Sequence, residues 1–260
     1  MDTKTLPTRS PMPKVVVFGL ASCFGCQLQI ANDEKHLMDV LGQMDLQYWQ
    51  LVSDQPLPQE FDVAIIEGAV TTAEAVDLVK EIRERAAVVI TIGACAETAG
   101  IPGLALSDFE RDIDAVYGDN LPAACGEITK PVSVGSIIQV DFAVHCCPID
   151  TASFIDVLQR VLYGSNKSAL TTTMCGQCKI NERPCLYSAG QICMGLVTRA
   201  GCHAKCPNLG RPCNGCAGLS PDANIESAVA VVQSYGLDAD EFMRRLELFN
   251  ADALSPETTD

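Results

Sequence analysis

The chain has 260 residues, is 48% hydrophobic and carries a formal charge of −15. This length supports a sizeable core, which we expect to form one large α/β domain with a smaller appendage. The acidic balance argues against a nucleic-acid partner, because phosphates require a basic face, and no apolar stretch reaches the length of a membrane span.

Residues 1–13 form a polar N-terminal tail with several prolines and no apolar export signal. We therefore expect a cytoplasmic protein, in which thiols stay reduced. The 14 cysteines are then poor candidates for disulfides, which belong mainly to small secreted domains without an adequate core.

Short apolar runs and amphipathic stretches alternate in the first part of the chain. They predict strands at 15–19, 46–52, 62–66, 87–92 and 141–144 and helices at 27–41 and 71–85. The second helix begins with a capping-box pattern, Thr71 to Glu74. This alternation is typical of a doubly wound parallel sheet, which binds ligands at the carboxyl ends of its strands.

Four cysteines follow predicted strands, namely Cys23, Cys26, Cys95 and Cys147. In a parallel sheet they would all project from one rim. Cys23-x-x-Cys26 alone also fits a redox dithiol or a zinc knuckle. A redox dithiol leaves the other two thiols unexplained, whereas a 4Fe-4S cluster uses all four.

The composition of the sequence changes after residue 165. Between residues 171 and 218 apolar periodicity is weak, and eight cysteines occur: Cys175, Cys178, Cys185, Cys193, Cys202, Cys206, Cys213 and Cys216. A segment without an apolar core is expected to fold around bound metal. Two cubane clusters and two four-cysteine zinc sites both fit this spacing. Helices are expected at 225–235 and 240–248.

The sequence also resembles a known family. In order, Ala21-Ser-Cys23-Phe-Gly-Cys26, Glu67-Gly68, Gly93-Ala-Cys95, Ile101-Pro-Gly103 and Cys147-Pro148 resemble the small subunit of nickel–iron hydrogenases. This resemblance implies a flavodoxin-like domain over residues 14–165 whose proximal 4Fe-4S cluster is held by Cys23, Cys26, Cys95 and Cys147. The related subunit of respiratory complex I starts its motif with adjacent cysteines, so the separated Cys23 and Cys26 favour the hydrogenase side.

The C-terminal block resembles the cytoplasmic, multi-subunit hydrogenases of the sulfhydrogenase or cofactor-reducing type, in which both further clusters are cubanes. The similar stretches are Cys193-Met-Gly-Leu-Val-Thr-Arg-Ala-Gly-Cys202 and Gly210-Arg-Pro-Cys213-Asn-Gly-Cys216. Periplasmic members have His in place of Cys175 and often Pro in place of Cys206.

By this resemblance and by sequence order, residues 166–260 form a small, irregular iron–sulfur domain with C-terminal helices. The distal cluster is assigned to Cys175, Cys178, Cys185 and Cys193, and the medial cluster to Cys202, Cys206, Cys213 and Cys216.

The resemblance implies an electron-transfer subunit that makes and breaks no substrate bonds. Three 4Fe-4S clusters would connect the nickel–iron site of a partner large subunit with a flavin or iron–sulfur acceptor subunit. Two alternatives remain open at this point: a complex I-like electron-transfer subunit, and a zinc-stabilised binding module with no redox role.

Two residues compete with the assigned ligands. Cys146 stands where the family usually has Gly and is either a spare thiol or a rival ligand, and His203 is a rival at the medial site. Structural roles are expected for the remaining candidates, which are Cys125 as a packed thiol, His36 and His145 as surface or supporting residues, and Glu67 as a capping or ion-paired carboxylate with a proton route as its alternative.

Overall fold

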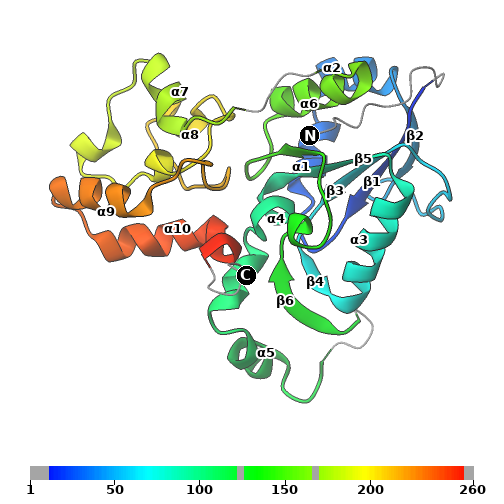
Figure 1. The fold of residues 1–260 in the computed structure, drawn as a ribbon, viewed down its shortest axis with the longest axis horizontal. Helices are drawn as coiled ribbons and strands as arrows, with labels where there is room; N and C mark the ends of the chain where they lie inside the picture. The colour runs from blue at the N-terminus through cyan, green and yellow to red at the C-terminus, as the bar shows by residue number, and fades with distance from the viewer. Residues whose placement is uncertain (1–11, 122–125, 166–169, 255–260) are drawn as a thin grey trace.

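The structure is a computed structural model that describes residues 12–121, 126–165 and 170–254 (Figure 1). Its strands are β1 (Lys14–Gly19), β2 (Asp45–Trp49), β3 (Val63–Glu67), β4 (Val70–Thr72), β5 (Val88–Ile92), β6 (Ile128–Val132) and β7 (Phe142–Val144). Its α-helices are α1 (Gly25–Ala31), α2 (Glu34–Leu41), α3 (Ala73–Arg85), α4 (Gly93–Thr98), α5 (Phe109–Tyr117), α6 (Thr151–Tyr163), α7 (Met174–Ile180), α8 (Lys205–Asn208), α9 (Ile225–Ser234) and α10 (Ala239–Leu254).

Five parallel strands form the central sheet in the order β2-β1-β3-β5-β7. This is the flavodoxin-like order of a doubly wound sheet, in which the connections place helices on both faces. The predicted α/β fold class is therefore confirmed, and all five predicted strands are present with shifted ends.

Alternate side chains of the strands enter two separate apolar layers. On β1, Val15 and Val17 pack on the face that Phe154 and Leu158 of α6 cover. Val16 packs on the opposite face, which α3 covers. Since both faces are buried, β3 and β5 need continuous apolar runs, and all their side chains are buried.

The C-terminal segment has an apolar core of its own, contrary to the prediction that it lacks one. Met174 and Val197 pack there against Phe242 and Leu246 of α10. Helix α10 then runs from this core towards α4 (Figure 1), where Thr98 Oγ1 donates a hydrogen bond of 2.5 Å to the Phe249 carbonyl. The last helix thus completes a core that the cysteine-rich residues 171–218 do not form alone.

Several local predictions were wrong. The helix expected at 27–41 is interrupted between α1 and α2 at Asn32 and Asp33, residue types that favour turns and helix caps. Thr72, not Thr71, caps α3 by accepting from the Ala75 amide at 3.1 Å, because β4 extends to Thr72 and the helix begins only at Ala73.

Several helices extend beyond or fall outside the predicted set. Helix α10 is longer than the range 240–248, and α4, α5, α6, α7 and α8 have no counterpart among the predicted elements. The domain boundary at residue 165 stays a prediction. No helix within the described ranges combines the length and the apolarity that a bilayer crossing requires.

Asp150 ties α6 to α8. Its carboxylate accepts from the Ser153 amide at 3.1 Å, which caps α6, and pairs with Lys205 Nζ at 2.5 Å. Burial on its own raises the pKa of Asp150, but Lys205 and Ser153 outweigh it, so the pKa lies below its ordinary value.

We expect Asp150→Asn to lower the free energy of unfolding by about 1 kcal/mol at neutral pH, because Asn can still cap α6 but loses the ion pair with Lys205 and the negative charge at the helix N-terminus. A carboxylate with a depressed pKa stabilises the fold above its unfolded pKa, and this contribution disappears as the pH falls through the folded pKa. The gap between wild type and variant should therefore close in acid. Denaturant titrations at several pH values measure this gap in unfolding free energy. Lys205→Gln is the control, because it removes the ion pair and keeps the Asp150 carboxylate as the cap. A gap that is constant with pH contradicts this account.

Candidate metal centres

The four thiols predicted at the sheet rim come from three connections. Cys23 and Cys26 follow β1, Cys95 lies in α4 directly after β5, and Cys147 follows β7. Cys26 is buried and Cys95 is half-buried, whereas Cys23 and Cys147 are exposed. The carboxyl ends of parallel strands meet at one edge, which brings residues far apart in sequence together.

These rim thiols influence one another electrostatically. The pKa of Cys147 is raised to about 11, chiefly because its sulfur is partly buried. The nearby thiols of Cys216, Cys95 and Cys23 add to this shift. Burial is also the main cause of the raised pKa of Cys26, with Cys147 contributing. We call Cys23, Cys26, Cys95 and Cys147 the rim set.

Backbone amides point at the sulfurs of the rim set. The Ile149 amide donates to Cys26 Sγ, and the Ile101 amide donates to Cys95 Sγ. Such donors favour the thiolate over the thiol and stabilise the anionic sulfur of iron–sulfur centres.

Glycine provides the room beside the buried thiol. Gly93 has a φ of +83°, and a Cβ added there would lie 2.4 Å from Cys26 Sγ. Gly25 is also close, since a Cβ there would lie 3.1 Å from Cys23 Sγ. The motifs Gly93-Ala-Cys95 and Cys23-Phe-Gly-Cys26 thus need glycine because their backbones run against sulfur atoms.

Glu67 caps α1, the helix that begins at Gly25 and contains Cys26. Its carboxylate, 1% exposed, accepts from the amides of Cys26 at 3.0 Å and Gln27 at 3.2 Å. A buried carboxylate at a helix N-terminus is stabilised by the orphan amides of the first turn. The capping role expected for Glu67 is therefore confirmed.

A second set of thiols surrounds α7 and the loop after it. Burial raises the pKa of Cys175 to about 11, and three further thiols reinforce the shift. These are Cys193, Cys178 and Cys185, so the structure brings together the four residues predicted for the distal cluster. We call them the distal set.

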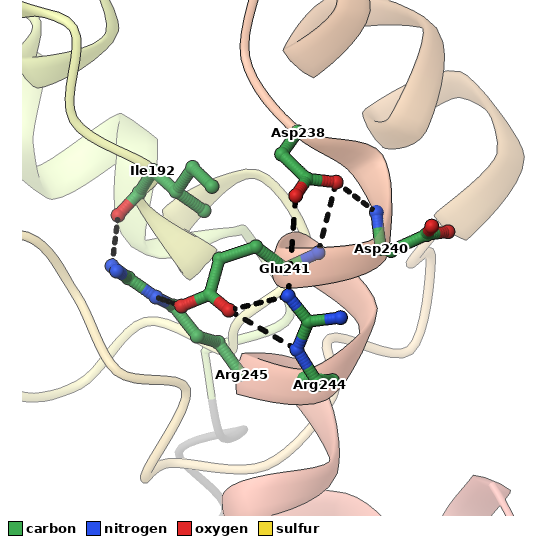
Figure 2. Close-up of polar contacts among 6 residues, drawn as sticks. All are labelled: Ile192, Asp238, Asp240, Glu241, Arg244 and Arg245. Atoms are coloured by element: carbon green, nitrogen blue, oxygen red, sulfur yellow. Dashed lines mark hydrogen bonds and ion pairs between the residues drawn. The ribbon is translucent and has the colours of Figure 1, made fainter.

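Helix α10 anchors the loop that ends in Cys193 (Figure 2). Arg245 Nη1 donates to the Ile192 carbonyl at 3.4 Å, and Glu241 holds the same guanidinium through Nε at 2.7 Å. The interaction places a charged helix side chain against the residue that precedes a candidate ligand.

The remaining four C-terminal thiols lie between the two sets already described. Burial raises the pKa of Cys206, and Cys216 and Cys202 contribute to the shift. Cys213 is next to Cys193, because the Cys213 amide donates to Cys193 Sγ at 3.2 Å. We call Cys202, Cys206, Cys213 and Cys216 the medial set.

Cys146 belongs spatially to the medial set rather than to its sequence neighbour. Its thiol hydrogen-bonds with those of Cys202 and Cys216, and these contacts with burial raise its pKa strongly. The Cys147 amide also donates to Cys216 Sγ. The dipeptide 146–147 therefore touches both sets, because Cys147 points to the rim set while Cys146 points to the medial set. No sequence signal distinguished the two directions.

The histidines have other roles. His36 pairs with Asp33 at 3.0 Å on the surface, and His203 is exposed. His145 is half-buried and its Nδ1 lies 3.4 Å from Glu97 Oε2, and loss of solvent around the two groups lowers the pKa of His145 to about 4 and raises that of Glu97 to about 7. Glu97 is not among the residues predicted from the sequence, because no motif marks it. Cys125 lies outside the described residues.

The donor sets fit iron–sulfur clusters in three ways. Each provides four thiols, backbone amides point at several of the sulfurs, and all the thiols except Cys23 and Cys147 are at least half-buried, which limits competing water. A Cβ on Gly195 would lie 3.3 Å from Cys175 Sγ and 3.6 Å from Cys193 Sγ, so glycine makes room at the distal set as well. Within the described ranges, no three His, Cys, Asp or Glu side chains converge as ligands of a single metal ion.

Comparison with protein families gives one match. The model of the NADH ubiquinone oxidoreductase 20 Kd subunit family matches residues 23–161. This range contains the rim set and Cys146 and ends before the distal and medial sets.

Similar proteins extend over more of the chain. The sulfhydrogenase 2 subunit delta of Pyrococcus furiosus is 30% identical over 91% of this chain and 98% of its own length. A vhu subunit of the F420-non-reducing hydrogenase of Methanocaldococcus jannaschii is 30% identical over 91% of this chain and 93% of its own.

Two solved structures share the fold. A chain of an NAD+-reducing nickel–iron hydrogenase in its H2-reduced state has a TM-score of 0.54 at 22% identity and covers 60% of this chain and 94% of its own. A chain of the Ni-Fe-Se hydrogenase from Desulfomicrobium baculatum has a TM-score of 0.53 at 13% identity and covers 80% and 95%.

We expect Gly93→Ala to lower metal occupancy at the rim set, because the new methyl group would collide with Cys26 Sγ and strain a positive φ. Iron content and the EPR signal of the first cluster measure the effect. Gly135→Ala is the matched control, since nothing lies within 4 Å of a Cβ there. Equal metal content in both variants contradicts the predicted collision.

For Cys146 we expect a supporting role rather than ligation. Cys146→Ser should retain all iron, because the medial set already has four thiols, whereas Cys146→Ala should lower the midpoint potential of one cluster by removing a hydrogen bond to ligand sulfur. Redox titration followed by EPR measures both. Loss of about four iron atoms in both variants would instead identify Cys146 as a ligand.

Proposed function

This chain belongs to the NADH ubiquinone oxidoreductase 20 Kd subunit family and is a homologue of hydrogenase subunits, and we propose that it serves a nickel–iron hydrogenase as its electron relay. The ligands are the rim set, the medial set and the distal set, each for one 4Fe-4S cluster. Bound clusters of this kind supply one-electron redox centres with potentials set by their surroundings. The chain itself holds them in place and performs no bond chemistry.

The single observation that carries the proposal is the serial contact between the three thiol sets. Cys147 of the rim set contacts Cys216 of the medial set through its amide. Cys213 of the medial set contacts Cys193 of the distal set, with 3.2 Å between amide nitrogen and sulfur. A row of sites with direct contacts between neighbours is the arrangement that electron transfer over a distance requires.

The protein's residues support this role by controlling charge. A 4Fe-4S site with four thiolates is anionic, and burial makes isolated charge costly. The amides of Ile149 and Ile101 at the rim set offset part of this cost without adding a titrating group. The glycines beside Cys26 and Cys175 leave space on the sulfur side of each backbone.

The rim set and the distal set are the two ends of the row of thiol sets, and each end suggests a partner. Cys23 and Cys147 are exposed at the rim, so a large subunit carrying the nickel–iron site would cover them and deliver electrons there. The distal set lies at the other end, where a flavin or iron–sulfur subunit would accept electrons. The expected cytoplasmic location is part of the same proposal, since free thiols persist in a reducing compartment.

The runner-up is a complex I-like electron-transfer subunit. It is favoured by the family model, whose match is confined to residues 23–161. The eight cysteines beyond that range lie in a region that the two hydrogenase relatives share, since each aligns with 91% of the chain. The hydrogenase relay accounts for these cysteines, and the runner-up leaves them without a role.

The test is metal analysis and EPR on the anaerobically purified complex with its large subunit. We expect about twelve iron and twelve sulfide per copy of this chain, and reduction of the signals by H2. Cys206→Ala should leave one site with three thiols and yield a three-iron cluster, lowering iron by about one atom. Cys125→Ala, at a thiol outside the three sets, is the control. Stoichiometric zinc and no EPR signal would contradict the relay.

A further inference from the structure

Charge is distributed unevenly along this acidic chain. Residues 170–218 contain five Lys or Arg residues and one carboxylate, Glu182, although the whole chain has a net charge of −15. The cysteine-rich segment is therefore basic while the remainder is strongly acidic. A local charge of opposite sign on one part of a protein directs its association with partners.

The cations of this segment gather on the surface of α7 and α8. Lys179 and Arg183 are exposed at the end of α7, and Arg211 is exposed after α8, whereas the exposed Lys205 is already paired with Asp150. Asn181 joins the two helices, because its Nδ2 donates to Asn208 Oδ1 at 3.1 Å and to the His203 carbonyl at 3.1 Å. Figure 1 shows α7 and α8 together, away from the central sheet.

Two exposed apolar side chains lie at the C-terminal ends of the same two helices. Ile180 is 80% exposed and Leu209 is 79% exposed, the highest values among the large hydrophobic residues that the structure describes. They follow Lys179 and Asn208 directly, so the Asn181 bridge places them on the same surface. An exposed apolar centre with a charged rim is typical of a protein-binding surface.

This surface is next to the distal set, from which electrons would leave the chain. Lys179, Ile180 and Arg183 lie between the ligands Cys178 and Cys185 of the distal set. Lys179 lowers the pKa of Cys175, although burial outweighs it, so the ammonium is close to the distal thiols. A partner that docks here would come close to the last cluster of the row.

We propose that the surface formed by Lys179, Ile180, Arg183, Leu209 and Arg211 docks an acidic one-electron redox protein. This inference rests on the proposed relay function and names the chemistry of its acceptor. The cations select a carboxylate-rich face by charge complementarity, while Ile180 and Leu209 supply the apolar contact. An acidic partner would be repelled by most of this chain and attracted only at the exit, which directs docking to the distal cluster.

The test measures H2-dependent reduction of three acceptors by the complex of this chain with its large subunit. The acceptors are an acidic plant-type ferredoxin, the basic cytochrome c and the small dye methyl viologen. Each H2 oxidised releases two protons and two electrons, which reduce two molecules of any of these acceptors. Ferredoxin reduction should be the fastest protein reaction and should slow as salt screens the charges.

We expect Lys179→Glu and Arg183→Glu to lower kcat/KM for ferredoxin by about 10-fold each and to leave methyl viologen reduction unchanged. Lys80→Glu on α3 is the control with the same change of charge on an exposed residue far from α7. For the apolar centre, Ile180→Ser should raise the KM for ferredoxin, whereas Val116→Ser, at a residue 72% exposed on α5, should not.

Three results would overturn the docking proposal while leaving the relay intact. One is a loss of ferredoxin and methyl viologen reduction to the same extent, which would mean that the cations only neutralise the clusters. The second is a preference for cytochrome c. The third is a salt-sensitive dimer of the complex that Lys179→Glu abolishes, which would assign the surface to a second copy. Failure of H2 to reduce any EPR signal in the wild type would instead overturn the relay itself.

Discussion

The contact between the sheet rim and the cysteine-rich segment through residues 146 and 147 is the constraint on which the arrangement of sites depends. Cys147 presents its thiol to the rim set while its amide donates to Cys216 Sγ, and Cys146 bonds with Cys202 and Cys216. The backbone turns at this dipeptide, where Cys146 has a φ of +92°, so one dipeptide can present its two thiols to two sites. The distance between the first two sites is thereby fixed by covalent geometry rather than by the packing of two loosely joined parts.

Burial of many thiols in one molecule has a cost that bound metal can offset. The pKa values of Cys147 and Cys175 are raised to about 11 by burial and by neighbouring sulfur. Thiolate ligands must lose their protons to bind metal, so cluster binding is coupled to proton release and to folding. Amide donors at Cys26, Cys95, Cys193 and Cys213 reduce the cost by favouring the charged form. The apolar core built by Phe242 and Leu246 supplies stability that does not depend on metal.

The sheet and the C-terminal segment position their cysteines in different ways. Parallel strands bring Cys95 and Cys147 to one edge because their carboxyl ends meet there. The segment after residue 170 is too irregular to position thiols by strand geometry, and it relies on short helices, glycines and the anchor of Arg245 on the Ile192 carbonyl. The separation of charge follows the same division, with the basic surface on the segment and the acidic excess elsewhere.

The sequence alone determined the fold class and the family. Buried parallel strands require continuous apolar runs, such as Val15 to Phe18, so they can be recognised in the sequence without a structure. Cysteine spacing can be recognised in the same way, since Cys-x-x-Cys pairs and motifs at strand ends are local features. The three groups of four thiols expected from motif resemblance and order are also brought together in space, and their role as cluster ligands stays a prediction.

Only the tertiary structure decided the features that depend on contacts between distant residues. The direction of the Cys146 thiol depends on where the medial set packs against the rim. The partner of Glu67 depends on the approach of α1 to the end of β3. Helix boundaries such as that of α3 depend on the pairing of β4 with β6, which keeps the chain in a strand up to Thr72. The surface around Ile180 and Leu209 exists because Asn181 joins two helices that lie far apart in sequence. Local pattern carries none of this information, because each of these features results from long-range packing.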